Sequence, residues 1–164
     1  WALADRGQRE EGIAKMRQGL ADYQAIPQGI HQPYLIALLA ESYGGVGQPA
    51  EGLTLLDEAL ALVDKGELRY YEPELYRLKG ELSLMGGQDE VAVEADLRRA
   101  INIARRQNAK SLELRAATSL GRLIQKQGKP DEARQILAEV YDWFTEGFDT
   151  ADLTKARALL DELA

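Results

Sequence analysis

The chain has 164 residues, of which 45% are hydrophobic and 29% are charged, and these values are typical of a folded, helix-rich protein. Its 27 acidic and 20 basic residues give a formal net charge of −7, which disfavours a nucleic-acid-binding module. The absence of cysteine excludes disulfides and thiolate chemistry, and no apolar run in the sequence is long enough to cross a bilayer.

The N-terminal part of the chain predicts the end of one helix and then a complete helix. Leu3 lies 40 positions before Tyr43, which falls near the end of a later helix, so residues 1–5 read as a last helical turn. Residues 10–25 then carry apolar side chains at helical spacing, namely Ile13, Met16 and Leu20. Because the chain begins with Trp1 rather than Met, we expect it to be a piece of a longer protein.

Four helices are predicted in the middle of the chain, and they begin near Pro33, Pro49, Pro73 and Glu90. Proline suits the first turn of a helix, because the N–H groups of that turn have no partner within the helix. Residues 26–32, 44–47 and 86–89 break the helical period and read as a loop and two turns.

Three further helices complete the chain, one capped by Ser111, one over residues 130–144, and a final one over residues 150–164. Asp149 or Thr150 is the expected cap of the final helix, which has one apolar and one charged face. We expect a nearby group of aromatic residues to hold this helix onto the preceding ones. The group consists of Trp143, Phe144 and Phe148.

A fixed period runs through these helices. The corresponding apolar residues are Leu20, Leu60, Ile101 and Tyr141, at separations of 40, 41 and 40 positions. A period of this length predicts an all-α fold, an α-solenoid of stacked antiparallel helix pairs. We therefore expect a single helical-repeat domain over residues 1–164. Its parts are a partial repeat at 1–32, repeats at 33–72, 73–110 and 111–149, and a capping helix at 150–164.

The repeats resemble the tetratricopeptide repeat (TPR) in their pattern of large and small residues. The second repeat carries this pattern at Ile36, Leu39, Ala40, Tyr43, Gly52, Leu56 and Ala59. The fourth repeat carries it at Leu120, Gly121, Ile124, Gly128, Ala133 and Leu137. The third repeat departs from it, because Lys79 and Ser83 occupy positions where apolar residues are expected. The period near 40 exceeds the 34 residues of the standard repeat, so the helices or connections must be longer.

Three segments resemble the C-terminal repeats of large bacterial signalling proteins. These segments are residues 74–82, 105–123 and 143–153. In that family a nucleotide cyclase or DNA-binding domain is joined to a regulatory ATPase module, which the repeats follow. The resemblance implies a cytoplasmic regulatory region. It implies no cyclase or ATPase activity for this chain, because the residues of those domains are absent.

The sequence offers little to catalysis or to a cofactor. Gly128 and Lys129 precede a proline and lack the upstream glycine of a phosphate-binding loop. The only histidine, His31, is expected to be a solvated loop residue, and no metal-ligand motif is present. The acidic residues Asp57, Glu58, Glu90, Glu94 and Asp96 read as a solvated face. We therefore expect neither an enzyme nor a bound cofactor.

An aromatic group, Tyr70, Tyr71 and Tyr76, accompanies Arg69 and Arg77 near the start of a helix. These side chains could form the rim of a ligand site. They could instead pack the long connection between two repeats, which is the commoner role of such aromatic residues.

In tetratricopeptide arrays the first helix of each repeat lines a concave groove that holds an extended peptide or a partner helix, and the resemblance implies such a groove here. The expected groove residues are Tyr34, Leu38, Glu41, Glu74, Arg77, Leu78, Glu81, Arg115, Ser119, Arg122 and Lys126. Arg115 or Arg122 could pair with a peptide carboxylate, because a guanidinium group suits bidentate contacts. These charges could equally be an ordinary exposed face of a scaffold.

The leading interpretation is a non-catalytic scaffold for protein–protein contact or for intramolecular regulation in a larger bacterial signalling protein. The alternative is a sensor of a small molecule or peptide that regulates an attached ATPase or cyclase. The expected partners are a protein, a peptide or other domains of the same chain, and neither nucleic acid nor a membrane. A second copy is a further candidate, since Leu3, Ile13, Met16 and Leu20 would be exposed if a preceding helix is missing.

Overall fold

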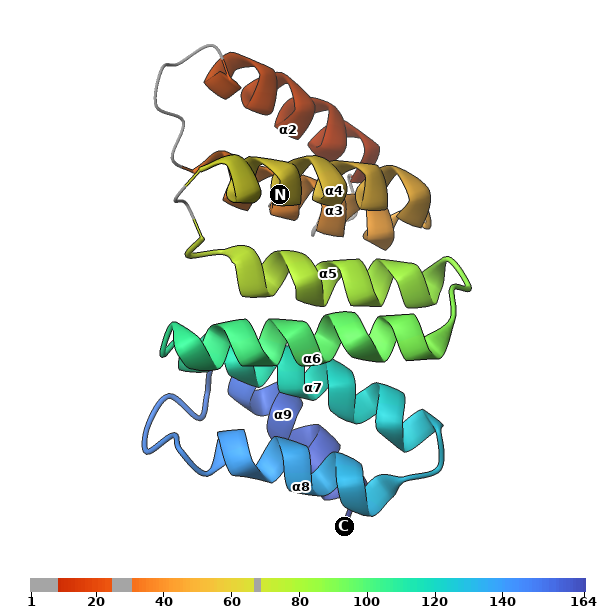
Figure 1. Ribbon diagram of the computed structural model, residues 1–164, viewed down its shortest axis with the longest axis vertical. Coiled ribbons are helices and arrows are strands. Elements are labelled where there is room, and N and C mark those ends of the chain that lie inside the picture. The colour runs from red at the N-terminus through yellow and green to blue at the C-terminus, as the bar shows by residue number, and fades with distance from the viewer. Residues whose placement is uncertain (1–8, 25–30, 67–68) are drawn as a thin grey trace.

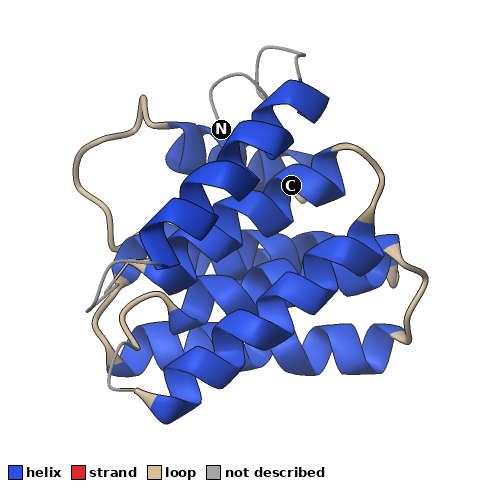
Figure 2. Ribbon diagram, turned by 90° about the horizontal axis from the view of Figure 1, so that it is seen from above, coloured by secondary structure: helices blue, strands red, loops and turns tan. Residues whose placement is uncertain are grey.

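The computed structural model describes residues 9–24, 31–66 and 69–164, and helix is the only regular secondary structure in those ranges (Figure 2). The helices are α2 (Arg9–Gln24), α3 (Gln32–Gly45), α4 (Pro49–Lys65), α5 (Glu72–Met85), α6 (Glu90–Arg106), α7 (Lys110–Lys126), α8 (Pro130–Tyr141) and α9 (Ala151–Glu162). They stack along the long axis of the molecule from α2 at one end to α8 at the other, with α9 between α7 and α8 (Figure 1). The predicted all-α solenoid is confirmed.

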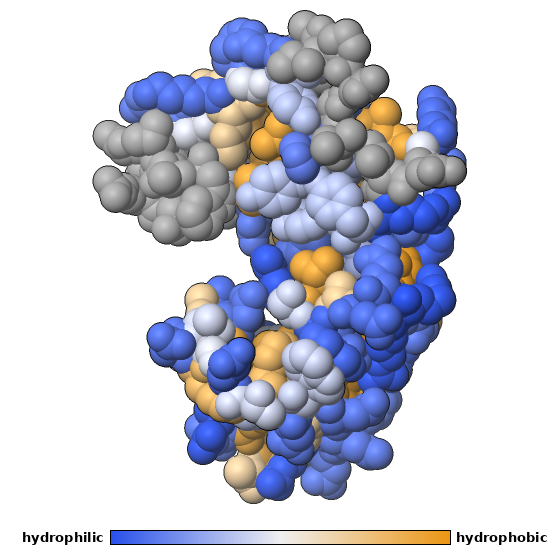
Figure 3. All heavy atoms as spheres, turned by 90° about the vertical axis from the view of Figure 1, so that its left-hand side faces the viewer, coloured by the Kyte–Doolittle hydropathy of each residue, from blue (hydrophilic) through white to orange (hydrophobic). Residues whose placement is uncertain are grey.

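The packing follows the repeat. Consecutive helices contact each other from α2 to α9, and α3, α5, α7 and α9 also contact their neighbours two elements away. These four helices therefore form one layer, and α4, α6 and α8 form the other. The molecule is hollowed on one side, between its upper and lower parts (Figure 3).

Glycine shapes the turns that close the helix pairs. Gly47, Gly87 and Gly128 adopt φ values of 75°, 75° and 79°, a left-handed conformation that side chains with a β-carbon rarely adopt. Each of these glycines follows the first helix of a pair, so the turns recur with the period of the sequence. Asn108 adopts the same conformation, with φ 54°, between α6 and α7.

Gly52 lets α3 and α4 approach closely, as the pattern of small residues predicts. A β-carbon at this position would lie 2.9 Å from the carbonyl oxygen of Ala40 and 2.5 Å from a methyl carbon of Leu82. Both distances are too short for real contacts, so a larger residue would push α4 away from α3 and α5. Gly52 is a packing residue.

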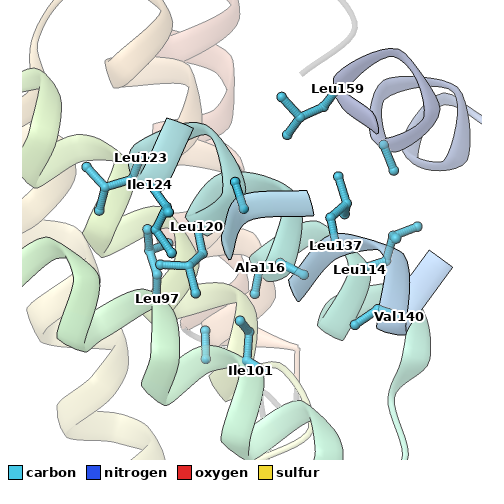
Figure 4. Packing of buried hydrophobic residues seen from close by; sticks show 14 of the residues in the cluster. Leu97, Ile101, Leu114, Ala116, Leu120, Leu123, Ile124, Leu137, Val140 and Leu159 are labelled. Atoms are coloured by element: carbon cyan, nitrogen blue, oxygen red, sulfur yellow. The ribbon is translucent and has the colours of Figure 1, made fainter. Parts of the chain in front are cut away.

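Two apolar clusters make up the core. One joins α2 to α5 through residues such as Ile36, Leu56 and Leu75. The other joins α5 to α9, and its side chains converge from α6, α7, α8 and α9 (Figure 4). The fully buried Leu120 and Leu137 belong to this second cluster. As a solenoid requires, the core is a strip shared by neighbouring repeats.

Several local predictions differ from the structure. The helix expected to reach residue 144 ends at Tyr141, and Ser111 lies inside α7, whose N-cap is Ala109. Phe144 packs against the core, but Trp143 is 59% exposed and Phe148 is 49% exposed. Only Phe144 of the predicted aromatic group therefore contributes to the core in the way expected.

The N-terminal edge is also less apolar than expected. Ile13 and Leu20 are only 8% and 9% exposed, and they belong to the core cluster that joins α2 to α5. Met16 is partly buried against the same cluster. Leu3 lies outside the described residues. The exposed surface that motivated self-association is therefore absent at Ile13 and Leu20.

In the third repeat, both polar residues fit the helix. Ser83 is buried, and the Lys79 ammonium donates to Asp57 of α4 at 2.8 Å.

Within the ranges that the structure describes, no helix is long and apolar enough to cross a membrane.

Candidate binding site on the concave face

The predicted groove residues lie on α3, α5 and α7, but they are not equally accessible. Leu78 is 2% exposed and belongs to the core, so its assignment to the groove surface is wrong. Glu74 and Arg77 are 2% and 5% exposed, and their charges are already paired. The remaining predicted residues are half-buried or exposed.

Glu74 and Arg77 form the centre of the site. They lie three positions apart on α5, so their side chains share one face of the helix. Arg77 Nε donates to Glu74 Oε2 at 2.9 Å, and Arg77 Nη2 donates to Glu74 Oε1 at 2.7 Å. Arg115 of α7 adds a contact to Glu74 Oε1 at 2.8 Å. Burial disfavours the charged form of Arg77, but hydrogen bonds and charges from Glu74 and Glu81 outweigh it, so the pKa of Arg77 is raised.

Glu81 extends this network along α5. It accepts from Arg77 Nη1 at 2.7 Å and from the Ser119 hydroxyl at 2.6 Å. Burial alone would raise the pKa of Glu81, but the Arg77 charge and the Ser119 hydrogen bond outweigh burial and lower it. The network therefore ties α5 to α7.

Glu41 of α3 completes the network at longer range. Its carboxylate lies 3.7 Å from Arg77 and 3.8 Å from Arg115. Burial raises the pKa of Glu41, and the two arginines only partly oppose this effect. We call Glu41, Glu74, Arg77, Glu81, Arg115 and Ser119 the central network.

A polar pocket of about 180 Å³ opens beside the central network. It is lined by Glu41, Arg77, Glu81, Arg115, Thr118, Ser119, Arg122, Asp152 and Lys155. Among the described residues, the Arg122 guanidinium and the Lys155 ammonium have no ion-pair or hydrogen-bond partner. These two cations, one from α7 and one from α9, line the same space as Asp152 of α9, whose carboxylate also has no partner among the described residues. We call this part of the site the basic end.

The contribution of α9 was not predicted from the sequence. Asp152 and Lys155 read as part of the charged face of a capping helix, because one helix alone does not show what its polar face opposes. The signal that could have found them is the repeat itself. By position, α9 is the next first helix after α7, and so its polar face continues the groove.

The predicted aromatic group divides between two sides of the molecule. Tyr76 is 8% exposed, and Arg99 of α6 lies 4.2 Å above its ring. Tyr70 and Tyr71 instead face α3, where Tyr71 meets Tyr34 edge-on at 5.1 Å between ring centroids. His31 Nδ1 lies 3.2 Å from the Tyr70 hydroxyl, so this histidine is exposed but has a partner. Burial, with the Glu74 charge, raises the pKa of Tyr71 to about 12.

The carboxylates that might have formed an acidic site are mostly paired. Asp57 binds Lys79, Glu94 accepts from Arg98 at 2.7 Å, and Glu90 accepts from Lys126 and Gln127. Across the described part of the chain, no group of three or more acidic, histidine or cysteine residues is placed to hold a metal ion. The concave face can therefore offer ion pairs, hydrogen bonds and apolar contacts.

Comparisons with known proteins concern the fold. No known family profile matches the chain. A protein of Rhizobium meliloti (strain 1021) that is named only as uncharacterized is 29% identical over 123 residues. That match covers 75% of this chain and 12% of the relative, so the chain spans about an eighth of the relative's length.

Two solved structures have the same architecture. The nearly identical TPR-like repeats attributed to a kinesin light chain of Podosopora anserina match with a TM-score of 0.70 and 18% identity, over 99% of this chain and 80% of that one. A substituted variant of that protein matches with a TM-score of 0.71, at the same identity and coverage. The chain has the fold of TPR-like repeats.

Proposed function

We propose that this chain is a non-catalytic helical-repeat scaffold that binds a protein or peptide partner on its concave face. The observation that carries the proposal is the pair of cations in the polar pocket, Arg122 and Lys155, which have no partner in the part of the chain that the structure describes. A charged group without a partner at the edge of a concave surface can bind an opposite charge at little cost in existing contacts. The group that fits two such cations is a carboxylate of the partner.

The central network lines the pocket, but its charges are already paired and do not supply the contact to the carboxylate. Arg77 and Arg115 already hold Glu74, so a second carboxylate would have to displace a buried one. The hydroxyls of Thr118 and Ser119 donate to the Leu114 carbonyl and to Glu81. Arg122 therefore remains a candidate for the carboxylate contact, whereas Arg115 serves the fold.

The proposal is tested with the double substitution Arg122→Glu with Lys155→Glu. We expect binding to acidic peptides on a peptide array to fall at least tenfold, because two attractive charges become repulsive. The melting temperature should change little, since neither side chain has an ion-pair partner among the residues that the structure describes. Fluorescence anisotropy with the peptides selected on the array measures the loss of binding, and thermal unfolding measures the melting temperature.

The matched control is Lys129→Glu with Arg134→Glu, which makes the same change of charge on exposed residues outside both concave-face pockets. Equal losses in the two double variants would mean that only net charge matters, and would contradict a site at the basic end.

A sensor of a small molecule or peptide is the second candidate, and the polar pocket between α7 and α9 supports it. Such a ligand would bind between α7 and α9 and change the curvature of the stack, and so regulate an attached ATPase or cyclase. Thermal-shift screening of metabolites tests this, because a ligand that binds only the folded chain raises the melting temperature. Small carboxylic acids that leave the melting temperature unchanged would count against the sensor.

We place the scaffold in the cytoplasm, within a larger bacterial signalling protein. This placement is supported by the similarity of residues 74–82, 105–123 and 143–153 to such proteins, and by a bacterial relative about eight times as long as the matched part. The partner is then another protein or another domain of the same chain. Binding of an upstream ATPase module, measured with both segments purified separately, tests the intramolecular case.

A further inference from the structure

A second concavity lies next to the polar pocket, and its character is apolar. It has a volume of about 400 Å³ and lies between the C-terminal halves of α5 and α7 and the N-terminal half of α6. Its lining residues are Gly80, Glu81, Leu84, Met85, Val93, Leu97, Ser119, Arg122, Leu123 and Lys126. We call it the apolar notch.

The apolar notch reaches the core of the repeat. Val93 and Leu97, which are 0% and 2% exposed, belong to the buried cluster and also line the notch. Gly80 packs directly against Leu97 at this point, because a β-carbon on Gly80 would lie only 2.9 Å from Leu97 Cγ. At the mouth, Met85 is 57% exposed, and its unbranched side chain can adjust to different shapes. The notch can therefore surround an apolar group with core side chains below it and a movable one beside it.

The apolar notch and the polar pocket adjoin each other. They share Glu81, Ser119 and Arg122, so the free guanidinium of Arg122 borders both spaces. Lys126 also lies at the rim, where its side chain is 65% exposed and its charge is paired with Glu90 at 3.3 Å. Glu81 adds no free negative charge, because Arg77 and Ser119 hold it. An occupant of the notch would thus meet an apolar floor and a basic edge.

We propose that the apolar notch receives one large apolar side chain of the partner, such as leucine or phenylalanine, while a neighbouring carboxylate of the same segment binds Arg122. This inference rests on the proposed function and narrows the partner to a segment in which an apolar residue and an acidic residue are close together. A buried apolar anchor of this kind commonly carries much of the affinity of an interface. The charge fixes the orientation of the segment, and the notch supplies most of the affinity.

The test is an array of N-acetylated octapeptides on which the 164-residue chain is bound. Each peptide carries one leucine or phenylalanine and two glutamates at varied spacing, and matched sets replace the apolar residue with serine or the glutamates with glutamine. We expect binding only when both features are present, and at least a tenfold loss in either matched set.

The variant that isolates the apolar notch is Met85→Glu, with Val91→Glu as its control. Val91 is 73% exposed and does not line the notch, so this control adds the same charge to a nearby apolar position. We expect Met85→Glu to weaken the best peptide at least tenfold and Val91→Glu to leave it within twofold. Both variants should keep the melting temperature, because both side chains are exposed.

The outcomes separate the two levels of the proposal. Peptides that bind through Arg122 and Lys155 but ignore Met85→Glu would overturn the apolar notch and leave the proposed function in place. Binding of acidic peptides regardless of their apolar residue would overturn it in the same way. Failure of every peptide on the array to bind would overturn the notch and also count against the proposed function. Dodecanoate is added as a small amphiphilic acid in the same binding and melting experiments. If it raises the melting temperature but displaces no peptide, the notch binds a small amphiphilic acid and the proposal is wrong.

Discussion

At the centre of the concave face, Arg77 is 5% exposed and its guanidinium meets Glu74 on one side and Glu81 on the other. Near the C-terminal end of α7, Arg122 is exposed and has no partner among the described residues. Both arginines occupy the groove-facing side of a first helix, and in the sequence they look alike.

The difference shows that the sign and number of charges in a groove do not measure its capacity to bind. That capacity depends on whether ion-pair partners from the same helix or from neighbouring helices already neutralise each charge. The α5 arginine has a glutamate three positions before it and another four positions after it on its own helix. The α7 arginine borders α9, which offers the free Lys155 at the same pocket. The first arrangement stabilises the stack, and the second leaves charge available to a partner.

The largest expected effect comes from removing the central arginine. Arg77→Ala leaves Glu74 buried with Arg115 as its remaining partner, and breaking a buried pair in this way costs about 3–5 kcal/mol. Urea denaturation measures the loss in the free energy of unfolding. Arg98→Ala is the control, because Arg98 is 44% exposed and holds Glu94 and Glu132 at the surface, where ion pairs are worth about 0–1 kcal/mol. Similar losses in both variants would show that the central network stabilises the fold no more than a surface ion pair does.

A smaller effect is expected from pH. Because the folded pKa of Glu81 is lowered, its ionisation favours the folded state above the ordinary value of 4.5, and this contribution is lost as the pH falls through the folded pKa. The free energy of unfolding should therefore fall less steeply below pH 4.5 in Glu81→Gln than in the unaltered chain. Chemical denaturation at a series of pH values measures this slope. Identical slopes in the two proteins would show that Glu81 does not contribute to the pH dependence of the free energy of unfolding.

Much of the fold could be predicted from the sequence, because the determinants repeat. Gly52 and Leu56 indicate close helix packing, and the turn glycines recur with the helix pairs. The central network is harder to predict. Spacing on α5 indicates that Glu74 and Arg77 share a face, but not that Arg115 from the next repeat approaches within 2.8 Å and that the pair is buried.

The least predictable features depend on where a helix stops. The sequence predicts that the aromatic group after α8 holds the final helix onto the stack, but α8 ends at Tyr141 and Trp143 is left exposed. The role of Lys155 was missed for a related reason, since the polar face of a last helix shows the same composition whether it meets solvent or a groove. Such features depend on tertiary geometry that local periodicity does not contain.

Chemical-shift mapping by NMR tests the central claim most directly. The ¹⁵N-labelled chain is titrated with the acidic octapeptide that binds most tightly on the array. The account predicts that the largest shifts fall at residues 118–126 and 151–155, while amides at the centre of α4 stay unchanged. Shifts concentrated on α4 and α6, or spread evenly over the chain, would contradict binding at the basic end of the concave face.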